Sequence, residues 1–223
     1  MKKSLIAGNW KMNKTCVESG ELALEIRNKY KYASHSEVLL IPPFTSLKTV
    51  REIISGSNIL LGAQNFYPEK SGAFTGEISY NQLLELGCSY VLIGHSERRA
   101  ILKEDNAFIN QKVKVAVDKG LCPILCVGET KDERENNKTQ YVLSRQINEG
   151  LKGLNRELGR FITIAYEPVW AIGTGLVAQP EDIQENHAFI RGLIFDLFDG
   201  DTAETLRILY GGSVKPDNID SIM

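Results

Sequence analysis

Three side chains with the chemistry for proton transfer each stand at the end of a short apolar run. Lys11 comes just after the run 5–9, His95 comes at the end of the run 90–94, and Glu167 closes the run 161–167. An imidazole transfers protons or donates hydrogen bonds near neutral pH. A lysine ammonium can hold an anion, and a carboxylate can act as a base. These residue types predict an enzyme that moves a proton on a small anionic substrate.

Other polar residues accompany these three groups. Asn9 shares one strand face with Lys11, because side chains two residues apart point the same way. The sequence Glu97-Arg98-Arg99 follows His95 and would ordinarily be a solvated run of charges. Beside the lysine, Glu97 could instead pair with Lys11 and orient it.

An apolar segment with two glycines follows Glu167 directly. Proline stiffens its first end, and glycines permit unusual dihedral angles at its second end. We predict a lid that closes beside the base, while a buried turn beside a chance acid is the alternative. The lid residues are Pro168, Val169, Trp170, Ala171, Ile172, Gly173, Thr174 and Gly175.

A glycine pair, Gly211-Gly212, follows the apolar run 206–210 and precedes Ser213. Glycines let backbone N–H groups approach a phosphate closely, and a serine hydroxyl adds a donor. A glycine pair alone is weak evidence, but barrel enzymes often place phosphate after their seventh strand.

Strand-like and helix-like segments alternate along the whole chain and must position these groups. Helix-like segments surround Val17 to Ile26, span 109–117 and begin again at Pro180. Regular alternation of this kind indicates either an open doubly wound sheet or a closed barrel. Polar groups that follow small residues on one strand face favour the barrel, whose interior is narrow. The strands are predicted at 5–9, 38–42, 59–64, 90–94, 122–127, 161–167 and 206–210.

Composition argues against several classes of protein. The chain has 43% hydrophobic and 24% charged residues and a formal net charge of −2, so it carries no basic excess for nucleic acid or an anionic membrane. No apolar stretch reaches the ~18 residues of a transmembrane helix, and the N-terminus has no signal-peptide pattern. The four cysteines form no metal-type cluster. We expect a reduced, cytoplasmic protein without a metal.

Four blocks of this sequence together resemble the triosephosphate isomerase family. They occur in the family's order and extend over almost the whole chain. The resemblance implies a (β/α)8 TIM barrel that interconverts dihydroxyacetone phosphate and glyceraldehyde 3-phosphate without a metal or organic cofactor. The four blocks cover residues 7–13, 93–99, 165–175 and 210–214.

The resemblance also implies a role for individual residues. Glu167 is the base that removes a proton beside the carbonyl, and neutral His95 polarises that carbonyl. Lys11 and Asn9 hold the substrate and the charge that develops on its oxygen. Separately from the resemblance, we predict Glu97 as a catalytic residue through its pairing with Lys11. Backbone at Gly173 and Ser213 grips the phosphate.

The segment 65–79 resembles the family's protruding third loop, whose tip enters a neighbouring subunit. The residue that matches Thr75 lies near the partner's active site, so the resemblance implies a homodimer. A mobile surface loop is the alternative.

The chain departs from the family pattern at its end, where the eighth βα unit is missing. We therefore expect residues 1–223 to be a single TIM-barrel domain that is incomplete at its C-terminus, and a truncated record rather than a natural fragment. A molecule that truly ended here would be unstable and nearly inactive. Two other functions stay open: a sugar-phosphate epimerase, which would need a metal or a second acid, and a non-catalytic phosphate-binding barrel.

Overall fold

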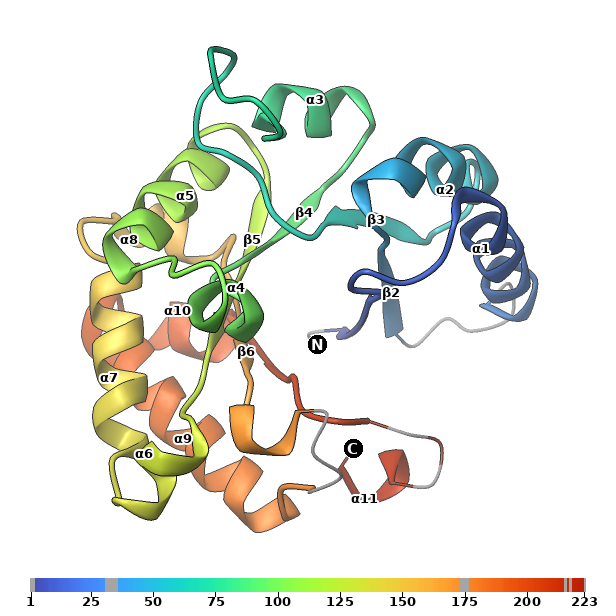
Figure 1. Ribbon diagram of the computed structural model, residues 1–223. Coiled ribbons are helices and arrows are strands. Elements are labelled where there is room, and N and C mark those ends of the chain that lie inside the picture. The colour runs from blue at the N-terminus through green and yellow to red at the C-terminus, as the bar shows by residue number, and fades with distance from the viewer. Residues whose placement is uncertain (1–2, 31–35, 173–176, 215, 217, 223) are drawn as a thin grey trace. The chain divides into compact units, whose positions relative to one another are not determined.

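The structure is a computed structural model that describes residues 3–30, 36–172, 177–214, 216 and 218–222. The chain divides into two compact units, which Figure 1 allows the reader to follow by colour. The first unit comprises Met1–Ile93 and Val115–Pro123, and the second comprises Gly94–Lys114 and Ile124–Met223. Each unit is described by itself.

The first unit contains four parallel strands that pair in the order of the sequence. Its strands are β1 (Ser4–Asn9), β2 (Ser36–Ile41), β3 (Leu60–Ala63) and β4 (Tyr90–Ile93). The connecting helices are α1 (Cys16–Tyr30), the 3-10 turn η1 (Phe44–Ser46), α2 (Leu47–Ile54) and α3 (Tyr80–Glu85). Parallel strands joined by helices place all strand carboxyl ends at one edge.

The helices of the first unit follow from local sequence signals. Leu47, Val50 and Ile54 lie at helical spacing on α2, and all three are buried. Helix α3 begins with a capping box, in which the Ser79 hydroxyl accepts from the Gln82 N–H and the Gln82 side chain accepts from the Ser79 N–H. These signals fix where the helices begin and which face they bury.

The second unit contains three parallel strands, again paired in sequence order. They are β5 (Cys122–Val127), which begins in the first unit, β6 (Thr163–Tyr166) and β7 (Arg207–Tyr210). Helices α7 and α9 lie side by side (Figure 1). The helical elements are α4 (Ser96–Ala100), α5 (Asn106–Asp118), α6 (Lys131–Glu135), α7 (Thr139–Gly150), α8 (Arg156–Gly159), η2 (Val169–Ala171), α9 (Pro180–Leu197), α10 (Gly200–Thr205) and α11 (Ile219–Ile222).

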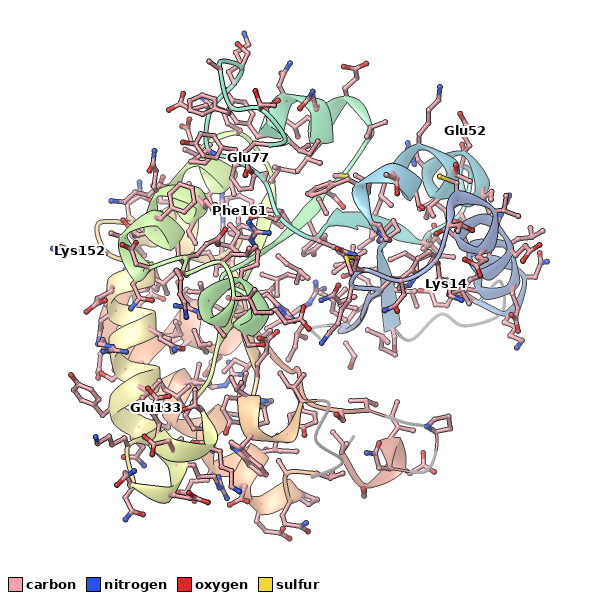
Figure 2. The ribbon with its side chains drawn as sticks, viewed as in Figure 1. Lys14, Glu52, Glu77, Glu133, Lys152 and Phe161 are labelled. Atoms are coloured by element: carbon pink, nitrogen blue, oxygen red, sulfur yellow. The ribbon has the colours of Figure 1, made fainter. Side chains whose placement is uncertain are left out.

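All seven predicted strands are present; the fifth has the predicted ends, and the other six differ at one or both ends. The sixth is the clearest change: β6 begins at Thr163, whereas Phe161, labelled in Figure 2, lies outside it and is 42% exposed. The predicted helix start at Pro180 is confirmed. Gly120 follows α5 with φ +84°, as expected of a glycine that ends a helix. The single domain over 1–223 stays a prediction.

No helix in the part of the chain that the structure describes has the length and apolarity to cross a membrane.

Candidate active site

His95 is the second residue after the end of β4 and caps the N-terminus of α4. The Nδ1 atom of its ring accepts a hydrogen bond from the Glu97 N–H at 3.3 Å. A ring nitrogen that accepts a hydrogen bond carries no proton, so the proton of the neutral imidazole sits on Nε2. The side chain is 9% exposed. His95 therefore offers an N–H donor on the side opposite α4.

Glu167 follows β6 and faces His95. Its Oε1 lies 3.3 Å from His95 Nε2, and its Oε2 accepts a hydrogen bond of 2.9 Å from the backbone N–H of Ser96. Glu167 is 5% exposed. The structure thus brings together the two groups that the sequence proposed as base and proton donor. The contribution of the Ser96 backbone was not foreseen.

Close backbone packing holds Glu167 in place. Its N–H donates to the Val127 carbonyl at 2.7 Å, and the Gly211 N–H donates to the Tyr166 carbonyl at 2.7 Å. A Cβ atom on Gly211 would lie 2.8 Å from Cγ of Glu167, closer than real Cβ contacts come. The glycine after β7 therefore makes room for the carboxylate. Its predicted role beside a phosphate stays a prediction.

The Cys126 thiol lies in β5, next to the Glu167 carboxylate. Burial raises the pKa of this thiol, and the negative charge of Glu167 raises it further. Cys126 is 1% exposed and is a free, buried cysteine. Among the described residues, no group of three or more His, Cys, Asp and Glu side chains could hold a metal ion.

A second carboxylate, Glu129, anchors the segment that follows Glu167. The Trp170 indole Nε1–H donates to Glu129 at 2.7 Å, and the Tyr166 hydroxyl lies 3.2 Å from each carboxylate oxygen. Burial raises the pKa of Glu129, although these hydrogen bonds oppose that shift. Sequence reasoning missed Glu129. Its position two residues after the end of β5 was the available signal.

The first part of the predicted lid forms the short turn η2. The Val169 N–H donates to the Glu129 carbonyl at 3.0 Å, and the Ser213 hydroxyl donates to the Ala171 carbonyl at 2.8 Å. Ser213 therefore binds this segment in the present structure. Residues Gly173, Thr174 and Gly175, which complete the predicted lid, lie outside the described residues.

In the first unit, Asn9 and Lys11 form a local arrangement at the carboxyl end of β1. The Asn9 side chain accepts from the Lys11 N–H at 3.0 Å, and the Lys11 carbonyl accepts from the Gln64 side chain at 2.8 Å. Lys11 has φ +52°, which non-glycine residues adopt rarely and often at functional positions. Gln64 is a further residue that sequence reasoning missed, although it follows β3 directly.

Glu97 lies at the edge of the site, with its side chain 47% exposed and Oε2 3.5 Å from His95 Nδ1. Its pairing with Lys11 stays a prediction, because the two residues belong to different units.

Thr75 is exposed on the segment between β3 and α3, which Glu77 marks in Figure 2. The segment is ordered by its own contacts. The Tyr67 N–H donates to the Ile78 carbonyl at 2.8 Å, and the rings of Tyr67 and Phe74 have centroids 4.3 Å apart. These contacts within the segment order its base and leave the tip that carries Thr75 exposed to solvent.

Known proteins are similar to this chain over its whole length. A model of the triosephosphate isomerase family matches residues 4–223. The triosephosphate isomerase of Carboxydothermus hydrogenoformans is 51% identical over 223 residues, which are 100% of this chain and 89% of that protein. Those of Syntrophotalea carbinolica and Roseiflexus castenholzii are 48% and 50% identical over all of this chain and 88% of their own lengths. On this sequence evidence, the chain belongs to the triosephosphate isomerase family.

Proposed function

We propose that this chain is an isomerase that interconverts dihydroxyacetone phosphate and D-glyceraldehyde 3-phosphate by proton transfer through an enediolate. The observation that supports this best is the pair formed by His95 and Glu167, in which a buried carboxylate oxygen lies 3.3 Å from Nε2 of the imidazole. Relatives about half identical over the full chain are named for this reaction.

Glu167 is the base in this proposal. It removes the proton from the carbon beside the substrate carbonyl and returns it to the neighbouring carbon. A well-placed base contributes about 10²–10⁴ in rate. The Ser96 N–H holds one carboxylate oxygen, so the other can point towards the substrate.

His95 meets the negative charge that develops on the substrate oxygen. Its Nε2–H donates to the carbonyl, because Nδ1 is occupied by the Glu97 N–H. One fixed donor of this kind is worth about 3–4 kcal/mol in the transition state. Neutral imidazole can also pass protons between the two substrate oxygens.

In this proposal Lys11 and Asn9 hold the substrate and its developing charge, and Glu97 pairs with Lys11 and orients it. Backbone at Gly173 and Ser213 binds the phosphate. The positive φ of Lys11 supports this role, since such backbone strain is retained at functional positions.

The segment from Pro168 to Gly175 acts as a lid that excludes water. An enediolate phosphate loses its phosphate readily in water, so exclusion of solvent protects the product. The bond from Trp170 to Glu129 gives the first part of this lid a fixed anchor.

The functional molecule is a cytoplasmic homodimer in which the tip carrying Thr75 approaches the active site of the partner. Each subunit is a single TIM-barrel domain. Support comes from the exposed tip with its internally bonded base.

The test is an isomerase assay coupled to a dehydrogenase that consumes one product. We expect turnover by the natural protein, no loss of rate with a chelator, and a rate lower by about 10²–10⁴ for Glu167→Gln. An unaffected rate in that variant would remove Glu167 as the base. Loss of activity with the chelator would favour a metal-dependent epimerase, and binding of phosphate without turnover would favour a non-catalytic barrel.

A further inference from the structure

Arg99 makes three hydrogen bonds at the base of the candidate site. Its Nε donates to the Gly94 carbonyl at 2.7 Å, its Nη1 to the Asn106 side chain at 2.5 Å, and its Nη2 to the Cys126 carbonyl at 3.1 Å. Gly94 is the residue before His95, and Cys126 is the thiol residue beside Glu167. One planar guanidinium thus binds the main chain next to both proposed reactive residues.

Gly94 has the geometry that this arrangement requires. Its φ is +72°, and a Cβ atom there would lie 3.0 Å from Nη2 of Arg99 and 3.0 Å from a methyl carbon of Ile109. A larger residue would therefore displace the guanidinium or the helix α5 that carries Ile109. The glycine before His95 and the arginine after it depend on each other.

The partners of Arg99 are neutral groups, which is uncommon for a partly buried arginine. Among the described residues, no carboxylate lies within ion-pair distance of its guanidinium, whereas the neighbouring Arg98 binds Glu104 at 2.7 Å. Burial lowers the pKa of Arg99, and Cys126, Glu167 and Glu104 partly oppose that shift. Arginine keeps its charge in such surroundings. We therefore attribute the role of Arg99 to its hydrogen bonds with neutral groups and not to an ion pair.

We propose that Arg99 is a positioning residue that fixes the main chain at Gly94 and so holds His95 and the Ser96 N–H against Glu167. This inference depends on the proposed function, because it assigns Arg99 a part in that reaction. Arg99 itself does not touch the reacting atoms. Asn106 supports it, because its amide group accepts from Arg99 and donates to Glu149 at 2.7 Å.

The first test measures kcat and KM for four variants. Arg99→Met should lower kcat by about 30–100-fold with KM within threefold, because a small displacement of a reactive group costs about 10² in rate. Arg99→Lys should recover part of kcat, and Asn106→Ala should lose about 3–10-fold. Arg98→Met is the matched control: it removes the adjacent arginine and should lower stability while kcat stays within threefold of the original protein.

The second test does not need turnover. Amide hydrogen exchange at Ser96 reports its bond to Glu167, and we expect it to become at least tenfold faster in Arg99→Met but not in Arg98→Met. If the original chain lacks isomerase activity, the proposed function fails and this exchange measurement decides the role of Arg99. If Arg99→Met does not fold, Arg99→Lys and Asn106→Ala decide it. The proposal would be overturned if these variants had the same kcat and the same Ser96 exchange rate as the original protein. It would also be overturned if Arg98→Met lost as much kcat, or gained as much exchange at Ser96, as the Arg99 variants.

Discussion

Two buried glutamates of the second unit, Glu167 and Glu104, are held in opposite ways. Glu167 is 5% exposed and meets a backbone N–H and an imidazole. Glu104 is 9% exposed, and one of its oxygens binds Lys112 at 2.6 Å and Arg98 at 2.7 Å. The two carboxylates are similarly buried, but Glu167 meets a backbone N–H and an imidazole, whereas Glu104 meets two cations.

The difference separates a carboxylate that can react from one that is structural. Two close cations hold a carboxylate in a network of charge-assisted hydrogen bonds, so such a group is fixed in place and is not available to a substrate. Neutral donors orient a carboxylate without neutralising its charge. Breaking an ion pair in the interior leaves a buried charge uncompensated, and that costs stability. We therefore expect activity to depend on Glu167 and stability to depend on Glu104 and its partners.

Glu167→Gln should show the largest effect and only on activity. We expect the rate to fall by about 10²–10⁴, while the free energy of unfolding changes by less than ~1 kcal/mol, since glutamine can still accept from the Ser96 N–H. Rate and urea unfolding should be measured on the same preparation. A large loss of stability would show that this carboxylate is structural after all.

Lys112→Met should have the reverse effect. Lys112 is 1% exposed, and its loss leaves Glu104 with Arg98 as its remaining close cation. We expect the free energy of unfolding to fall by about 3–5 kcal/mol, the usual cost of breaking a buried pair. Activity per folded molecule should stay the same. Unchanged urea unfolding would contradict the structural role assigned to Glu104.

His187→Asn should alter how stability depends on pH. His187 is half-buried on α9 beside the Tyr166 ring, and burial lowers its pKa to about 4. The His187 ring binds a proton more readily in the unfolded chain than in the folded chain. Its neutral form therefore contributes fully to the stability of the folded state above pH ~6.5, and this contribution is lost as the pH falls towards 4. The variant should remove about 1–3 kcal/mol of this decline.

Urea unfolding of both proteins at several pH values from 4 to 7 measures that difference. Parallel stability curves for the original chain and the variant would show that His187 does not contribute to acid sensitivity.

Lys29→Met should have the smallest effect and serves as the exposed counterpart of Lys112→Met. Lys29 lies 2.6 Å from Glu25 on α1, with side chains 77% and 58% exposed. Exposed pairs contribute little, because water and salt screen them. The urea midpoint should not shift measurably. A shift as large as that of Lys112→Met would mean that burial does not distinguish the two pairs.

Much of the fold could be predicted because alternation and periodicity are local properties of the sequence. Seven apolar runs gave the seven strands, and Pro180 gave the start of α9. The α/β class and the TIM-barrel fold of the family are confirmed. The ends of the strands were predicted less accurately than their existence. An apolar residue such as Phe161 can lie in a strand or in an exposed turn that precedes the strand.

The site could be predicted in part, because strand ends bring reactive side chains to one edge. His95 and Glu167 were identified as candidates in this way. The Ser96 N–H, Gln64 and Arg99 were missed, since a backbone donor has no sequence signal and the polar partners of a side chain depend on the folded chain. Arg99 in particular lies in a run of charges that would ordinarily be solvated.

The most direct test of the central claim is proton exchange with solvent, measured by NMR of the product formed in D2O. If Glu167 removes the substrate proton and exchanges it with solvent before returning one to carbon, the product formed in D2O should carry deuterium at the carbon beside the carbonyl. Glu167→Gln should incorporate deuterium there at least 100-fold more slowly. Equal deuterium incorporation by the two proteins would contradict the account.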